Sequence, residues 1–105
     1  MPDTICAIST PIGRGGIGIV RLSGERSLPI AKKIFRTKAR FISHRLLYGK
    51  IYDPSSNSFI DEALLCYMKA PRTYTREDVV EINLHSSFNV LSDVLSLVLK
   101  EGARL

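Results

Sequence analysis

Three glycines near the start of the chain have the spacing of a phosphate-binding motif. Gly13, Gly15 and Gly18 match G-x-G-x-x-G, a pattern with which many proteins bind dinucleotides. In that motif the glycines follow a strand and open a helix, whose N-terminal N–H groups hold the pyrophosphate. Here residues 17–20 read Ile-Gly-Ile-Val, which is typical of a second strand. The glycines therefore indicate a hairpin connection, or a close approach of a backbone or ligand, rather than a dinucleotide site.

One arginine stands out in the strand predicted for residues 16–22. Alternation places Arg21 on the same face as Ile17 and Ile19. A guanidinium buried on such an apolar face needs a partner, because an unpaired buried charge costs several kcal/mol. If Arg21 lies at the strand end, its head group reaches solvent instead. Arg21 is a candidate site residue on the first interpretation only.

A second candidate surface lies on the strand predicted for residues 79–84. Glu81, Asn83 and His85 point to one face, and the apolar residues between them point to the other. Their donors and acceptors suit a heterocycle with amide and amine edges. The same pattern also fits the solvated face of an antiparallel sheet. No spacing in the chain pairs a nucleophile with a base, so no catalytic residues are predicted.

Basic residues outnumber acidic ones. Fifteen lysines and arginines stand against ten aspartates and glutamates, which gives a formal net charge of +5. This excess favours anionic partners such as nucleic acid, phosphate or a polycarboxylate. A loose basic cluster consists of Lys32, Lys33, Arg36, Lys38 and Arg40. It fits a solvated helix end, where cations complement the helix dipole, and it also fits a nucleic-acid patch.

The cysteines and the apolar runs bear on the compartment. Cys6 and Cys66 are far apart, form no metal or redox spacing, and each lies in an apolar stretch. This pattern predicts two buried free thiols, in keeping with a reducing cytosol, and no metal site. No apolar run approaches the roughly 20 residues that span a bilayer, and residues 1–3 lack the features of a signal peptide. We expect a cytoplasmic protein with no membrane contact.

β-branched and alternating residues predict five strands. They cover residues 3–9, 16–22, 45–52, 60–68 and 79–84. In the first strand, Ile5 and Cys6 are expected to face the core. Residues 10–15, 53–57 and 71–75 are rich in prolines, glycines or other turn formers and are expected to be loops.

Two helices are predicted from apolar residues at helical spacing. The first begins at the N-cap Ser27 and carries Ile30, Ala31, Ile34 and Phe35. The second carries an apolar stripe over residues 90–99, with Ser86 or Ser87 as its cap and Gly102 as its stop. The order of elements predicts one α+β domain over residues 1–105, with helices on one side of a mostly antiparallel sheet. Since Arg104 and Leu105 begin a further segment, we expect a fragment of a longer protein.

Several stretches resemble the start of the MnmE/TrmE family of tRNA-modification GTPases. They are D-T-I at residues 3–5, S-T-P-I-G-R-G-G-I-G-I at 9–19, R-L-S-G at 21–24, P-R-T-Y-T-R-E-D-V-V-E at 71–81, and His85. The likeness covers almost the whole chain at the expected spacing. It implies a fold similar to the folate-binding domain of aminomethyltransferases and a homodimer that brings the folate pocket together.

The resemblance also implies a function. The ligand would be a reduced folate, 5-formyl- or 5,10-methylene-tetrahydrofolate, as a one-carbon donor for modification of a wobble uridine in tRNA. The partners would be tRNA and a flavin-dependent enzyme of the MnmG/GidA type. GTP, K⁺ and Mg²⁺ would bind in other domains of the longer GTPase, since this chain has no G-x-x-x-x-G-K-[ST] sequence. This fragment is therefore not expected to be an enzyme.

Arg21 and Glu81 match family positions that contact folate. Glu81 would accept hydrogen bonds from the pterin 2-amino group and ring N–H, and the planar fork of Arg21 would meet the pterin or a folate carbonyl or carboxylate. The chain departs from the family at Arg76, Ser86 and Ser87, where glycines are usual. Glycine serves positive φ or close backbone approach, so these changes bear on folate affinity.

Two alternatives remain open at this point. The first is a dimerisation or interaction domain that has lost folate binding, which the substituted glycines favour. The second is a small basic RNA-binding domain, which needs basic and aromatic residues on one exposed sheet face. Tyr48, Tyr52 and Tyr67 are the aromatic candidates, and they also fit ordinary sheet packing.

Overall fold

A twisted antiparallel sheet forms the centre of the fold. The computed structural model describes residues 3–8, 17–73, 76–85 and 87–105. The whole predicted loop at 10–15, the last two residues of the predicted loop at 71–75, and Ser86 lie outside these residues. Within these residues the strands are β1 (Ile5–Ile8), β2 (Ile17–Ser23), β3 (Phe35–Arg36), β4 (Arg45–Asp53), β5 (Ser58–Met68) and β6 (Val79–His85). They pair in the order β1-β2-β6-β5-β4-β3, and each pairing is antiparallel.

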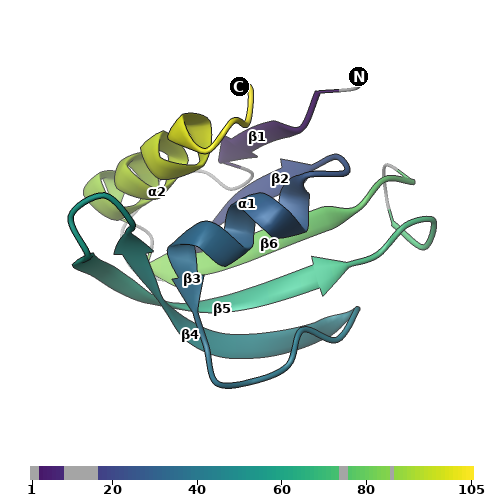
Figure 1. Ribbon diagram of the computed structural model, residues 1–105, viewed down its shortest axis with the longest axis horizontal. Coiled ribbons are helices and arrows are strands. Elements are labelled where there is room, and N and C mark those ends of the chain that lie inside the picture. Colours follow the sequence, from purple (N-terminus) through teal and green to yellow (C-terminus); the bar gives the residue numbers. More distant parts are fainter. Residues whose placement is uncertain (1–2, 9–16, 74–75, 86) are drawn as a thin grey trace.

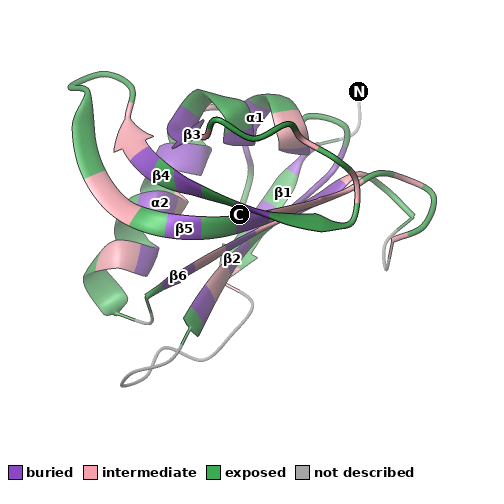
Figure 2. Cartoon of the chain, turned by 90° about the horizontal axis from the view of Figure 1, so that it is seen from below, coloured by how far each residue is buried: buried purple, intermediate pink, exposed green. Residues whose placement is uncertain are grey.

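Two helices, α1 (Ser27–Ile34) and α2 (Phe88–Lys100), lie on the same face of this sheet (Figure 1). The core fills the space between the helices and that face. Its fully buried side chains include Leu22, Ile30, Ile34, Ile51, Leu65, Ile82, Leu91, Val94 and Val98. Figure 2 shows the alternation of buried and exposed residues along the strands that this arrangement produces. The predicted α+β architecture is confirmed, and the uncovered side of the sheet is called the open face below.

The first helix starts differently from the prediction. Ser27 is its first residue and not its N-cap, which is Arg26, without a side-chain capping bond. The hydroxyl of Ser27 is buried and donates to the carbonyls of Gly24 at 2.8 Å and Asp78 at 3.2 Å. A buried hydroxyl needs such partners, so Ser27 joins the start of α1 to the residue before β6 instead of capping the helix.

Three further sequence predictions meet a clear outcome. Ile5 is 44% exposed, so of the predicted pair Ile5 and Cys6 only Cys6 faces the core, because neighbouring strand residues point to opposite faces. Phe35 does not extend α1 but begins β3, where it pairs with Ile51. The predicted start and end of the second helix are confirmed. Ser87 caps its start by accepting a hydrogen bond from Val90 N, and Gly102 follows its end with φ +114°.

Gly49 makes room for β3. It lies in β4, and a Cβ atom there would lie 2.5 Å from the Arg36 carbonyl oxygen and overlap the Phe35 ring. Phe35 is buried and pairs through its backbone with β4. Phe35 fits helical spacing in the sequence. In the structure it lies in a strand, because Gly49 leaves space for its ring.

Gly49→Ala is expected to lower the free energy of unfolding by about 1–3 kcal/mol, because the added methyl group overpacks the contact with Phe35. Urea denaturation monitored by circular dichroism measures this change. Lys50→Ala, one residue along on the exposed side of β4, is the control and is expected to stay within about 0.5 kcal/mol of the wild type. Equal stability of the two variants would contradict the packing role of Gly49.

Candidate functional site

Arg21 and Glu81 face each other across the centre of the open face. They are direct Cα partners in the β2–β6 ladder. Arg21 Nε donates to Glu81 Oε2 at 2.7 Å, and Nη2 donates to the same oxygen. The predicted face shared by Arg21, Ile17 and Ile19 is correct, but it is the open face and not the core. The guanidinium therefore has both a partner and access to solvent, with 47% of its side chain exposed.

The pair lies at the wall of a cavity of about 770 Å³. The strands supply Arg21, Glu81 and the apolar side chain of Val79, and the segment before β6 supplies Arg72 and Arg76. Since Glu81 already pairs with Arg21, Arg72 and Arg76 give the cavity an excess of positive charge. The cavity therefore combines a held carboxylate with a cationic rim, a combination that suits a ligand with amide-like donors at one end and negative charge at the other.

Local hydrogen bonds hold the segment that forms this rim. His44 Nε2 lies 2.8 Å from the Arg72 carbonyl oxygen, so the loop before β4 supports the loop before β6. Thr73 Oγ1 donates to the Glu77 carbonyl at 2.6 Å, and Ala70 N donates to Asp78 Oδ1 at 2.8 Å. The rim is thus anchored at both of its ends.

Asn83 and His85 do not join Glu81 in this cavity. Asn83 Nδ2 donates to the Leu64 carbonyl at 3.0 Å, and His85 Nδ1 lies 2.9 Å from Asp61 Oδ2. Both line a smaller hollow of about 280 Å³ on the open face. The shared face of the three polar residues is confirmed, but the structure divides them between two hollows.

The pKa of the His85 imidazole is raised by its neighbours. The hydrogen bond to Asp61, followed by the charge of that carboxylate, raises the pKa of His85. The side chain is 72% exposed, so solvent screens this pair. Asp61 comes from β5, where sequence reasoning identified no polar partner for His85.

The two cysteines are free, as expected, but only Cys6 is buried, and Cys66 is half-buried. Burial raises the pKa of both thiols, and the Glu81 carboxylate raises that of Cys66 further. A raised pKa leaves little thiolate at neutral pH and makes both sulfurs poor nucleophiles.

Metal-binding clusters and membrane-spanning helices are absent from the residues that the structure describes. No group of three or more histidine, cysteine, aspartate or glutamate side chains is arranged to hold a metal ion. No helix within these residues is long and apolar enough to cross a membrane.

Sequence reasoning identified Arg21, Glu81 and Arg76 but not the pairing of Arg21 with Glu81, and it missed His44 and Arg72 at the rim of the cavity. His44 and Arg72 come from loops that lie far apart in the chain and meet through the hydrogen bond between them. Their sequence signal is weak, because an exposed loop histidine or arginine resembles any other polar surface residue. The proline at residue 71 indicated only a loop.

These observations define a class of protein: an α+β domain with helices on one sheet face and a charged pair at a cavity on the other. Residues 4–105 match the family model described as GTP-binding protein TrmE N-terminus, and the chain belongs to this family. The resemblance found in the sequence is thereby confirmed.

Curated relatives agree with this membership. The chain is 54% identical over 106 residues to the tRNA modification GTPase MnmE of Acetivibrio thermocellus, and 55% identical over 106 residues to that of Syntrophobacter fumaroxidans. It is 53% identical over 105 residues to that of Streptococcus agalactiae serotype Ia. Each match covers 98% of this chain and 23% of the relative, so the chain spans about a quarter of their length.

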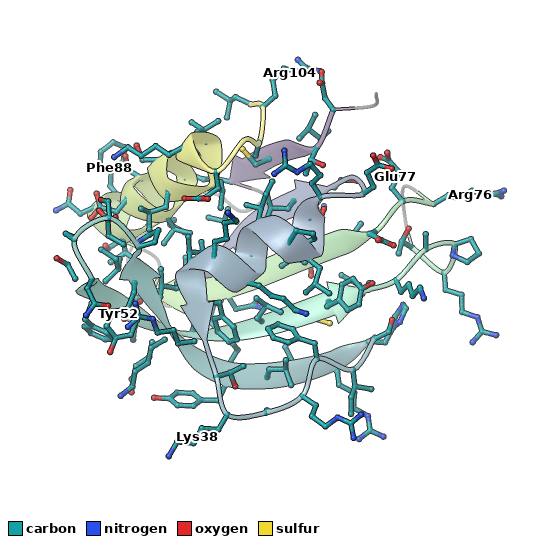
Figure 3. All side chains as sticks on the ribbon, viewed as in Figure 1. Lys38, Tyr52, Arg76, Glu77, Phe88 and Arg104 are labelled. Atoms are coloured by element: carbon teal, nitrogen blue, oxygen red, sulfur yellow. The ribbon has the colours of Figure 1, made fainter. Side chains whose placement is uncertain are left out.

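The substituted glycine positions differ in their backbone. Arg76 has φ +62°, in the left-handed region that favours glycine. Ser87 has φ −117° and ψ 144°, an extended conformation that any residue adopts, and it caps α2. Ser86 lies outside the described residues. Of the two positions described, only Arg76 therefore carries backbone strain, and Arg76 also lines the cavity. Figure 3 labels Arg76 in the segment before β6.

Arg76→Gly is expected to raise the free energy of unfolding by about 0.5–1 kcal/mol. Relief of left-handed strain of about 1–2 kcal/mol outweighs the extra entropy that glycine gives the unfolded chain. Urea denaturation measures the change. Arg72→Gly, in the same rim and not among the described residues of positive φ, is the matched control and is expected to be destabilised. A loss of stability in both variants would show that Arg76 is not strained.

Proposed function

We propose that this chain is the folate-binding and dimer-forming domain of a longer GTPase that modifies the wobble uridine of tRNA. GTPase activity and tRNA modification are named for relatives of which the chain spans 23%. The folate part rests on one observation, the Arg21–Glu81 pair at the wall of a cavity of about 770 Å³. That volume lies within the range of about 300–1,000 Å³ typical of small-molecule sites.

Glu81 is the group that recognises the pterin in this proposal. A pterin presents a 2-amino group and a ring N–H side by side, and a carboxylate accepts two parallel hydrogen bonds from them. Both hydrogen bonds from Arg21 go to Oε2 of Glu81. They orient the carboxylate and do not involve its other oxygen, Oε1. The rest of the Arg21 fork is available to a folate carbonyl or carboxylate.

The other end of a folate carries glutamate carboxylates. Arg72 and Arg76 line the same cavity and are not neutralised by Glu81, which pairs with Arg21. Their positive charge complements a dicarboxylate tail. The ligand in this proposal is 5-formyl- or 5,10-methylene-tetrahydrofolate, and it supplies the one-carbon unit.

The wider role follows from the family. The domain would hold the one-carbon donor, and catalysis would take place elsewhere in the assembly. GTP, K⁺ and Mg²⁺ would bind other domains of the longer protein, whose partners in the cytoplasm would be tRNA and a flavin-dependent enzyme of the MnmG/GidA type. The net charge of +5 is compatible with an RNA partner.

Calorimetric titration of 5-formyltetrahydrofolate tests the folate site. The wild type is expected to bind, and Arg21→Ala and Glu81→Ala are each expected to lose about 1.5–3 kcal/mol of binding free energy, the worth of a hydrogen bond to a charged group. The matched control is Arg104→Ala, which breaks another ion pair, to Asp3 at 2.7 Å, outside the cavity. It is expected to bind like the wild type.

Folding of each variant is checked by circular dichroism. If the folded wild type binds no folate, the site proposal is wrong and the interaction-domain alternative takes its place. If Arg104→Ala loses as much affinity as Glu81→Ala, the effect is general electrostatics and not recognition at the cavity.

The dimer part of the proposal rests on exposed apolar residues of the open face. Ile17 and Leu46 are each 62% exposed and Leu64 is 39% exposed. Leu46 lies in the cross-strand row that carries Glu81, since Leu46 pairs with Cys66, which in turn pairs with Glu81, and Leu64 lies in the next row, paired with Asn83. An apolar surface continuous with the folate cavity fits a twin domain that closes over it.

Leu46→Lys and Leu64→Lys are expected to convert a dimer into a monomer, because each places a charge in an apolar interface. Sedimentation velocity measures the mass. Phe88→Lys is the control, since Phe88 is 63% exposed but belongs to α2, which covers the opposite face of the sheet. A wild-type monomer, or loss of the dimer in the Phe88 variant alone, would contradict this surface.

A further inference from the structure

A second groove lies at the other edge of the sheet, along β3 and β4. Its volume is about 670 Å³, and its wall contains three cations and two tyrosines: Arg36, Lys38, Lys50, Tyr48 and Tyr52. It shares no lining residue with the cavity at Arg21 and Glu81. Figure 3 places Lys38 and Tyr52 at the β3–β4 side of the molecule.

The cations of this groove are not arranged for stability. Arg36 and Lys50 are direct Cα partners of the β3–β4 ladder, so two positive charges stand opposite each other, which is unfavourable. Lys38 and Lys50 form no ion pair within the described part of the chain. Glu62 is the Cα partner of Lys50 on its other side. One carboxylate beside three cations leaves an excess of positive charge.

The basic cluster identified in the sequence divides into two parts, one at the end of α1 and one in this groove. Lys32 lies 5.1 Å from the Phe41 ring centroid, and Lys33 lies 3.8 Å from Glu101, so both act at the end of α1 as the helix-end interpretation predicts. Arg36 and Lys38 follow the helix and line the groove. The nucleic-acid interpretation therefore applies to the second half of the cluster only.

The two tyrosines of the groove are held by contacts of their own. Tyr48 is 54% exposed, and its hydroxyl donates to Glu62 Oε1 at 2.7 Å, which fixes the ring on the open surface. The Tyr52 ring lies 3.9 Å from the Arg36 guanidinium carbon and packs edge-on against Phe59 at 5.8 Å. Tyr67, the third aromatic candidate, packs against the core and takes no part.

A stacked guanidinium and an exposed ring are flat surfaces that suit a nucleobase. The guanidinium of Arg36 lies over Tyr52 and also donates to Asn57 Oδ1, so its plane is fixed. Base stacking on an aromatic side chain tolerates any sequence, and nearby lysines attract the backbone phosphates. Alternating flat rings and negative charges are the chemistry of a single-stranded nucleic acid.

We propose that this groove binds a single-stranded segment of RNA. Lys38, Lys50 and Arg36 contact successive phosphates, and one base stacks on Tyr48. The choice of RNA over DNA rests on the proposed function in tRNA modification. The groove shares no lining residue with the folate cavity, so RNA binding and folate binding fail independently. Tyr48 is the Cα partner of Leu64, so RNA stacked on this ring and a twin domain on Leu46 and Leu64 compete for the same part of the open face.

Fluorescence anisotropy with a labelled oligouridine at several salt concentrations tests the groove. For single strands the slope of log K against log salt is about 0.7 per phosphate contact, so Lys38→Gln with Lys50→Gln is expected to reduce it by about 1.4. Lys69→Gln with Lys100→Gln removes the same charge from exposed lysines outside the groove and is expected to leave the slope unchanged.

Variants of Tyr48 separate stacking from charge. Tyr48→Ala is expected to weaken binding about tenfold, within the range measured for loss of one stacked base. Tyr48→Phe keeps the ring, loses only the bond to Glu62, and is expected to bind nearly as well as the wild type. Arg21→Ala, in the folate cavity, is expected to bind RNA normally whether or not folate binds.

Three results would overturn the proposal. The first is no binding by the folded wild type. The second is an equal change of slope in both double lysine variants, which would indicate net charge alone. The third is binding to anionic phosphatidylglycerol vesicles that exceeds RNA binding and does not depend on the ring of residue 48, which would indicate a lipid surface instead.

Discussion

The pairing of β2 with β6 is the constraint on which the site depends. Its register sets Arg21 directly opposite Glu81, and a shift by one residue would place the two side chains on opposite faces of the sheet. The buried residues on the other side of the same two strands, Val20, Leu22 and Ile82, prevent that shift because they have to meet the helices. The core therefore holds the charged pair in place without touching it.

The helices act on the site by covering one face of the sheet only. Ser27 ties α1 to the carbonyl of Asp78, and the side chain of Asp78 accepts from Ala70 N. One short chain of hydrogen bonds thus connects the buried helix start with the segment that forms the cavity rim. Because the helices occupy the opposite face, they leave the open face to the ligand and the second copy of the chain that we propose.

Positive charge is distributed in two places with different geometry. At the cavity, Arg72 and Arg76 surround a carboxylate that is already paired, and a compact ligand with a charged tail fits this arrangement. At the β3–β4 edge, Arg36 and Lys50 face each other beside exposed rings, and an extended polyanion fits better. In the two proposals, the separation gives each anionic ligand a cationic site of its own.

The sequence alone determined the α+β class, the extent of most strands, the second helix and the candidate pair, because these depend on local periodicity and on motifs contiguous in the chain. Tertiary structure decided the rest. Phe35 entered a strand because Gly49 leaves space for its ring, Ser27 became a buried bridge because Asp78 lies beside it, and the rim formed where His44 meets Arg72. Contacts between distant segments leave no period in the sequence, so only the folded chain reveals them.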